Sequence, residues 1–296
     1  AIVRVADKLG YVHNYAASTL SLRASKFVLL ILPNISNSVF AETINGLTDA
    51  LGAHGYSLII GYSGYSQDGE ERLIRELLGH QPVAIILTGF VHTPTSRNLV
   101  RRGAIPIVEI WNIGPKPIDM AVGFSNLQAA REMTRHLVRR GHRRLAYAGG
   151  TQTDNDRTRA REIGFRQAHK EARLNVRESW IVSLLMELAS GCDLARDLMT
   201  RHERPTAIFA ASDIIAAGFV LECQRLGFRV PEDIAVAGFD DTPLSATIEP
   251  QLTTVQVPQR QIGQVAGEMI LDRLRNGRTG LRQRDLGFSV IERSSV

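Results

Sequence analysis

The sequence predicts an α/β protein made of two doubly wound parallel-sheet subdomains. Short apolar segments typical of buried strands alternate with helical segments along nearly the whole chain. The alternation occurs in two series, and 296 residues are enough for two units that each have a core. Strand–helix–strand repeats of this kind give parallel sheets with helices on both faces.

The first series begins with the apolar strand FVLLIL (27–32). Asn37 can cap the helix that follows, because apolar residues then recur at helical spacing, at Phe40, Ile44, Leu47 and Leu51. The strands YSLIIGY, VAIILT and IPIVEI come next, each followed by a turn or a charged helical segment. MAVGF is a further strand, and it precedes a helix from Asn126 to Arg140.

The second series opens at RRLAYAGG (143–150) and continues through a helix at 158–172, the strand SWIVSL and a helix at 191–202. The unit at 206–240 is the clearest. TAIFA is a buried strand, Ser212 and Asp213 can cap a helix that Gly227 ends, and IAVAGF is the next strand.

Polar side chains gather where the strands of this last unit end. In an open α/β sheet the ligand crevice lies beyond the carboxyl ends of the strands. Ser212, Asp213, Asp240 and Asp241 all fall there, and their oxygens are suited to accept hydrogen bonds from the hydroxyls of a small polar molecule.

Composition indicates an ordinary globular protein, with 44% apolar and 22% charged residues. The net charge of +5 fits a solvated arginine-rich surface as well as a nucleic-acid partner. Cys192 and Cys223 have no metal-binding spacing and are expected to be reduced thiols. No apolar run is long enough for a membrane span, and the N-terminus lacks the pattern of a signal peptide, so we expect a cytoplasmic protein.

Catalytic and metal-binding patterns are weak. GYSGY (61–65) is one residue short of a nucleophile elbow, and the eight histidines form no HExxH. Asp240 and Asp241 could bind a divalent cation, but no third carboxylate lies nearby in the sequence. We therefore expect no enzyme activity, no metal and no cofactor.

Three sequence motifs resemble those of the LacI/GalR family of sugar-responsive repressors, namely FAASDIIAAG, LGFRVPEDIAVAGFDD and PQLTTVQVP. Within that family NSVFAE and PIDMAVGFSN look most like the gluconate-operon repressors. The resemblance implies a periplasmic-binding-protein-like fold and a DNA-binding regulator gated by a small sugar or sugar acid, with gluconate favoured. The alternatives are a periplasmic sugar-binding protein of the same architecture and an enzyme on an α/β fold.

The resemblance also implies a domain plan. Residues 1–25 match the end of a DNA-binding headpiece and a hinge helix, and the family's helix-turn-helix would precede Ala1. The N-terminal core subdomain is expected at 26–140 with 256–285, and the C-terminal one at 141–255 with 286–296. Family members are homodimers, so residues 37–53 and 68–80 are expected at an interface whose symmetry would match a palindromic operator.

Three residues in NYAASTLSL (14–22) match the family's minor-groove hinge: Asn14, Ala17 and Leu20. In the family a leucine at the place of Leu20 wedges between base steps and kinks the duplex. The alternative is that Leu20 is an apolar residue in a flexible linker, since so short a helix is marginal in water. Ser18 replaces a common basic residue, so phosphate contacts are expected to be fewer.

The effector pocket is expected between the subdomains. Arg161 and Asp240 match the family's pocket arginine and aspartate, which bind carboxylate or hydroxyl groups. For Arg161 the alternative is an exposed charge on a helix, which is the interpretation that we keep for its neighbours Arg157, Arg159 and Arg166. For Asp240 the alternative is a turn residue. The other pocket candidates are the apolar walls Phe40 and Trp111, which could instead be core, and the polar residues Asn37, Ser38, Thr88, Ser125 and Ser212.

Overall fold

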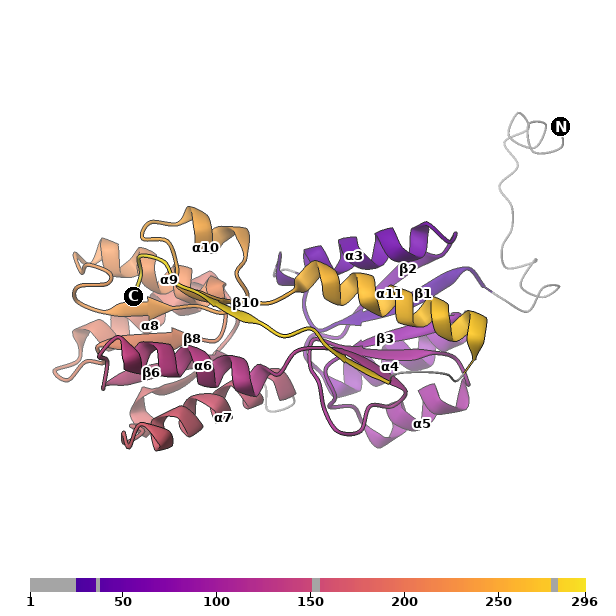
Figure 1. Cartoon of the computed structure of the whole chain (residues 1–296), viewed down its shortest axis with the longest axis horizontal. Coiled ribbons are helices and arrows are strands. Elements are labelled where there is room, and N and C mark those ends of the chain that lie inside the picture. The colour runs from indigo at the N-terminus through magenta and orange to yellow at the C-terminus, as the bar shows by residue number, and fades with distance from the viewer. Residues whose placement is uncertain (1–24, 36–37, 151–154, 278–281) are drawn as a thin grey trace, which may run out of the picture.

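The chain folds into two α/β lobes that lie end to end and are joined by crossing segments (Figure 1). The computed structural model describes residues 25–35, 38–150, 155–277 and 282–296. The hinge candidates Asn14, Ala17 and Leu20 lie outside these residues. The predicted fold class is confirmed, because every strand pair within the two main sheets is parallel.

The N-terminal lobe is a six-stranded sheet in the order β11-β5-β4-β3-β1-β2, with helices on both faces. The strands are β1 (Phe27–Leu32), β2 (Ser57–Tyr62), β3 (Ala84–Thr88), β4 (Ile107–Ile110), β5 (Met120–Gly123) and β11 (Gln283–Asp285). The helices are η1 (Ser38–Phe40), α3 (Ala41–Gly52), α4 (Gln67–Leu78), α5 (Pro94–Arg102) and α11 (Gln259–Asn276).

Strand β1 shows why the sheet is covered on both sides. Side chains along a strand alternate between faces, and Val28, Leu30 and Leu32 pack into the cluster that includes α3 and α11. Leu29 and Ile31 point the other way, into the cluster that includes α4 and α5. A continuous apolar strand therefore requires two helical layers.

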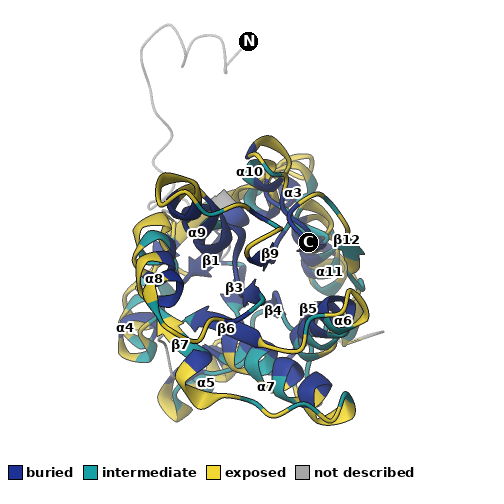
Figure 2. Ribbon diagram, turned by 90° about the vertical axis from the view of Figure 1, so that its left-hand side faces the viewer, coloured by how far each residue is buried: buried dark blue, intermediate teal, exposed yellow. Residues whose placement is uncertain are grey.

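The C-terminal lobe is a four-stranded sheet in the order β7-β6-β8-β9. Its strands except the edge strand β7 are mainly buried, and helices with exposed outer faces lie around them (Figure 2). The strands are β6 (Leu145–Gly150), β7 (Ile181–Leu184), β8 (Ala207–Ala210) and β9 (Ala235–Ala237). The helices are α6 (Asn126–Arg139), α7 (Asp156–Glu171), η2 (Glu178–Trp180), α8 (Leu188–Thr200), α9 (Asp213–Arg225) and α10 (Pro243–Thr247).

The prediction that the chain first crosses between the lobes near residue 140 is wrong. Helix α6 packs against α7 in the C-terminal lobe, so the chain crosses between β5 and α6, at residues 124–125 (Figure 1). The boundary 26–140 therefore becomes 26–124. Apolar spacing shows that α6 has a buried face but does not show which sheet receives it.

Two further crossings run through a small antiparallel ribbon. Strand β10 (Thr254–Gln256) pairs with β12 (Ser289–Ile291). After β10 the chain enters α11 of the N-terminal lobe, and after β11 it leaves that lobe into β12. Three connections therefore join the lobes, which lets the lobes reorient without losing their own cores.

Glycines let three helix pairs approach closely, namely α3 with α11, α6 with α7 and α8 with α9. A Cβ on Gly263 of α11 would lie 2.0 Å from the Thr43 carbonyl oxygen of α3. In the C-terminal lobe a Cβ on Gly164 would lie 2.2 Å from the Leu127 carbonyl oxygen, and one on Gly218 would lie 2.0 Å from the Leu188 carbonyl oxygen. These contacts involve backbone atoms, which cannot move aside as a side-chain end can.

We therefore expect Gly263→Ala to destabilise the protein by about 1–3 kcal/mol or more, because the added methyl group overpacks the α3–α11 contact. Gly52→Ala is the matched control, since a Cβ there meets nothing within 4 Å. Urea denaturation followed by circular dichroism measures both. Equal stability of Gly263→Ala and the wild type would show that the two helices can separate at no cost.

Candidate functional site

A small cavity lies between the two lobes, at the carboxyl ends of their strands. It encloses about 30 Å³, which is room for only a few water molecules. A ligand of sugar size therefore needs the lobes or the lining side chains to move apart. The lining residues are Val39, Phe40, Tyr65, Trp111, Asn155, Arg157, Thr158, Arg161, Met186, Ala211, Ser212 and Asp240.

Arg161 on α7 is buried with its guanidinium in a fixed position. Its Nε donates to Asn126 Oδ1 at 2.9 Å and its Nη1 donates to the Ala211 carbonyl oxygen at 2.6 Å. Its Cζ lies 3.6 Å from the ring centroid of Phe239, at cation–π distance. Burial lowers the pKa of Arg161, and the charge of Asp240 opposes this shift.

Asp240 lies opposite Arg161, in the segment between β9 and α10, and leaves one oxygen free. Its Oδ2 accepts from Ser212 Oγ at 3.3 Å. Its Oδ1 lies 3.8 Å from Arg161 Nη2, is buried, and has no hydrogen-bond donor among the described residues. Burial raises the pKa of Asp240 to about 6, although Arg161 acts in the opposite direction. Oδ1 is therefore a buried acceptor that a ligand hydroxyl could satisfy.

Two aromatic rings form the wall on the N-terminal lobe. Phe40 and Trp111 stack edge to face with centroids 5.0 Å apart. Trp111 adopts the left-handed backbone conformation, with φ at 70°, and its Nε1 donates to Thr43 Oγ1 at 3.2 Å. Both rings are almost fully buried, so the wall is part of the core and borders the cavity at the same time.

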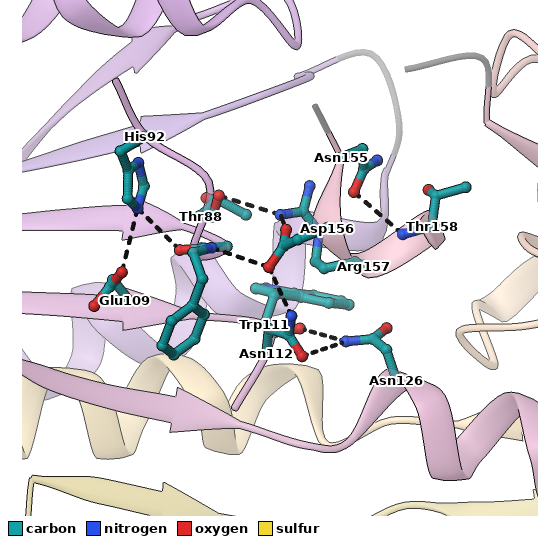
Figure 3. Close-up of polar contacts among 12 residues, drawn as sticks. Thr88, His92, Glu109, Trp111, Asn112, Asn126, Asn155, Asp156, Arg157 and Thr158 are labelled. Atoms are coloured by element: carbon teal, nitrogen blue, oxygen red, sulfur yellow. Dashed lines mark hydrogen bonds and ion pairs between the residues drawn. The ribbon is translucent and has the colours of Figure 1, made fainter. Parts of the chain in front are cut away.

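A set of polar contacts crosses between the lobes beside the cavity (Figure 3). Asp156, the first residue of α7, accepts from the Phe90 backbone N–H at 3.0 Å and from Asn112 Nδ2 at 2.6 Å. Arg157 Nη1 donates to the Thr88 carbonyl oxygen at 3.1 Å. The start of α7 is thus attached to the N-terminal lobe.

The loop that receives these contacts is held by a buried charged cluster made of Glu70, His92 and Glu109. His92 Nδ1 lies 2.7 Å from Glu70 Oε1, and Nε2 lies 3.3 Å from Glu109 Oε1 and 3.2 Å from the Gly89 carbonyl oxygen. Burial opposes the charge of His92, but hydrogen bonds to Glu109 and Glu70 and their charges outweigh it and raise its pKa to about 9. His92 is therefore an imidazolium that ties α4 and β4 to the loop after β3.

Similar proteins agree on one family. Residues 134–296 match the family described as periplasmic binding protein-like domain. The HTH-type transcriptional regulator GntR of Escherichia coli (strain K12) is 34% identical over 295 residues, which cover 100% of this chain and 88% of the relative. The chain belongs to the LacI family of transcriptional regulators.

Solved structures of LacI-family proteins have the same architecture. The transcription regulator GntR from Chromobacterium violaceum is 32% identical, with a TM-score of 0.86 over 91% of this chain and 98% of that one. A Lacl family transcriptional regulator from Silicibacter pomeroyi is 28% identical, with a TM-score of 0.91 over 99% of this chain and 89% of that one. These relatives are regulators of transcription.

The structure of this LacI-family chain brings five of the predicted pocket residues together around the cavity, namely Phe40, Trp111, Arg161, Ser212 and Asp240. Thr88 lines a neighbouring cavity, where its hydroxyl donates to the Ile31 carbonyl oxygen. Ser125 caps α6 by accepting from the Gln128 N–H and does not line the cavity. Asn37 and the side chain of Ser38 lie outside the described part of the chain.

Two acidic residues that follow the strands of the C-terminal sheet serve the fold, and for Asp241 a structural role was the expected one. Asp213 is buried and accepts from the Thr242 N–H and from the hydroxyl groups of Thr242 and Thr254. Asp241 pairs with Arg293 at 2.7 Å. Ser212 occupies the N-cap position of α9, but its hydroxyl makes no capping hydrogen bond and donates to Asp240 Oδ2 instead. Within the described residues no group of His, Cys, Asp or Glu is arranged to hold a metal ion, and no helix is long and apolar enough to span a bilayer.

Sequence reasoning missed Arg157, which is buried and lines the cavity. We had expected it to be an exposed charge. The signal was its position four residues before Arg161, because residues four apart share one face of a helix. Asn126 was also missed as the partner of Arg161, since the predicted site residue was its neighbour Ser125.

The raised pKa of His92 predicts a pH effect on stability. A group whose pKa is higher in the folded state stabilises fully below its unfolded pKa of 6.5, and this contribution is lost as the pH rises through about 9. The free energy of unfolding should therefore fall by roughly 1–3 kcal/mol more between pH 6.5 and 9.5 in the wild type than in His92→Gln. Guanidinium titrations at several pH values measure this difference, and parallel pH profiles would contradict it.

Proposed function

We propose that this chain is the effector-binding core of a DNA-binding transcriptional repressor that acts in the cytoplasm. Membership of the LacI family supports the regulatory role, and the cavity between the lobes supports gating by a small molecule. The alternative of a periplasmic sugar-binding protein is not favoured, because relatives that match 98% or more of the chain are regulators of transcription.

The proposed effector is a sugar acid of gluconate type. One observation carries this choice: the buried guanidinium of Arg161 lies beside Asp240 Oδ1, an acceptor without a donor among the described residues. A ligand with both a carboxylate and hydroxyl groups satisfies both, because arginine binds the carboxylate and Asp240 accepts from a hydroxyl. Arg157 adds a second positive charge to the cavity wall and favours an anion over a neutral sugar.

In the proposed mechanism the effector changes the relative orientation of the lobes. The cavity is too small for a sugar acid, so the lobes or the lining side chains must move apart on binding, and the proposed mechanism assigns this movement to the lobes. The effector shifts the population of lobe arrangements by as much as its affinities for them differ. The crossing segments at residues 124–125, at β10 and at β12 transmit this change to the N-terminal lobe, which is nearest to the operator in the proposed assembly.

We also propose a homodimer, and its support lies at one edge of the N-terminal sheet. Strands of parallel sheets are normally covered on both faces. The edge strand β2 instead leaves Ile59, Ile60 and Tyr62 38%, 43% and 54% exposed. Three such side chains on one exposed strand are typical of an interface between chains. This strand lies between the segments 37–53 and 68–80, which were expected at the interface.

Binding of D-gluconate tests the pocket. We expect Arg161→Ala and Asp240→Ala each to weaken binding by roughly 1.5–3 kcal/mol, the scale of a hydrogen bond to a charged group. Arg159→Ala is the matched control, because Arg159 is an exposed arginine on the same helix and does not line the cavity. Isothermal titration calorimetry measures all three. Wild-type affinity in both pocket variants would place the effector elsewhere, and binding of neutral polyols but not of gluconate would refute the sugar acid.

The dimer has its own test. Ile60→Lys should shift the chain from dimer to monomer at micromolar concentration, because it places a charge in the proposed apolar interface. Ile163→Lys is the control, since Ile163 is equally exposed, at 43%, but lies on α7. Light scattering coupled to size exclusion reports the mass. A wild-type monomer, or a dimer that tolerates Ile60→Lys, would rule out this interface.

A further inference from the structure

We infer that Asp156 and Gly89 form an interlobe lock that holds the two lobes closed through contacts between protein atoms alone. This inference goes beyond the proposed function, because it does not depend on which molecule the cavity binds. It rests on the contacts that cross between the lobes in Figure 3 and on the lack of room for a side chain at Gly89 beside them.

Asp156 supplies most of the lock. It begins α7 in the C-terminal lobe, and its Oδ2 accepts two hydrogen bonds from the N-terminal lobe, from the Phe90 N–H and from Asn112. Hydrogen bonds to a carboxylate are stronger than those between neutral groups. The next residue, Arg157, donates to the carbonyl oxygen of Thr88, the last residue of β3, two residues before Phe90. The two contacts are therefore expected to form or break together.

Gly89 allows the Asp156 and Arg157 side chains to lie close to the backbone of the loop after β3. Its φ is +87°, a conformation that favours glycine, and it lies directly under the Asp156–Arg157 pair. A Cβ at this position would lie 2.4 Å from Arg157 Nη1 and 2.5 Å from Asp156 Oδ1. A side chain here would therefore displace the Asp156 carboxylate and the Arg157 guanidinium from the positions in which they contact the N-terminal lobe.

The N-terminal half of the lock is anchored within its own lobe. His92 contacts the Gly89 carbonyl oxygen, and Arg97 Nη2 donates to the Phe90 carbonyl oxygen at 2.6 Å. His92 is held in turn by Glu70 and Glu109. The loop after β3 is thus held to its own lobe at Gly89 and at Phe90, which donates to Asp156. When the lobes separate, the loop therefore stays with the N-terminal lobe and its contacts with α7 break.

The lock is also connected to the pocket arginine. Asn112, which donates to Asp156, accepts from Asn126 Nδ2 at 3.3 Å, and Asn126 Oδ1 accepts from Arg161 Nε. A continuous chain of side-chain hydrogen bonds therefore runs from Arg161 through Asn126 and Asn112 to Asp156. Arg161 and Asp156 lie on the same helix, so a shift of α7 acts on the pocket and the lock at once.

Distance measurements between the lobes test the lock without any ligand. Spin labels attached through unnatural amino acids at Arg102 of α5 and Lys170 of α7 leave both cysteines untouched, and dilution with unlabelled chain removes distances between subunits. The wild type should give one short, narrow distribution by double electron–electron resonance. Asp156→Ala and Gly89→Ala should each raise the ratio of long to short distances on the order of tenfold or more, the factor for one lost charge-assisted hydrogen bond.

Glu162→Ala is the matched control, because Glu162 is an acidic residue of α7 that pairs with Arg166 on the same helix, and it should keep the wild-type distribution. If Gly89→Ala does not fold, Asp156→Asn is the substitute variant, because it preserves the shape of the side chain but loses its charge. It should also raise the ratio of long to short distances. The Asp156→Ala and Gly89→Ala effects should not add, since both break the same contact. A wild-type distribution in Asp156→Ala, or a wild type that is already mostly open, would overturn the lock.

Discussion

The structure between the lobes depends on the burial of one guanidinium. A buried cation is costly unless it is paired and hydrogen-bonded. Arg161 meets this requirement with Asn126 of α6, the Ala211 carbonyl oxygen after β8, the face of Phe239 and the carboxylate of Asp240. These partners come from three different segments of the C-terminal lobe, so the charge of one residue fixes how the segments meet at the cavity.

The remaining interlobe chemistry extends from that centre along α7. Asp156, Arg157 and Arg161 lie in the first half of the helix. The first two contact the end of β3 and the loops after β3 and β4, and Arg161 contacts the Ala211 carbonyl oxygen beside the cavity. Asp240 leaves one oxygen unused at the centre of this arrangement. The site is therefore rigid where the protein provides its own partners and incomplete at the point where a ligand would supply a donor.

Much of the fold could be predicted from the sequence, because apolar strands such as FVLLIL and glycine-ended helices are local signals. The first crossing could not, since the buried face of α6 is compatible with either sheet and only tertiary contacts assign it to α7. The family resemblance, and not a local signal, predicted that Arg161 and Asp240 lie at the cavity, as they do. Arg157 was missed because charged residues are usually exposed, although its spacing from Arg161 placed both on one face.

The crystal structure of the chain with D-gluconate bound tests the central claim most directly. The account predicts density for the ligand between the lobes, with its carboxylate against the guanidinium of Arg161 and a hydroxyl donating to Asp240 Oδ1. It also predicts a cavity wider than the present 30 Å³. Density for gluconate at another site, or a bound ligand with Asp240 Oδ1 still without a donor, would contradict the account.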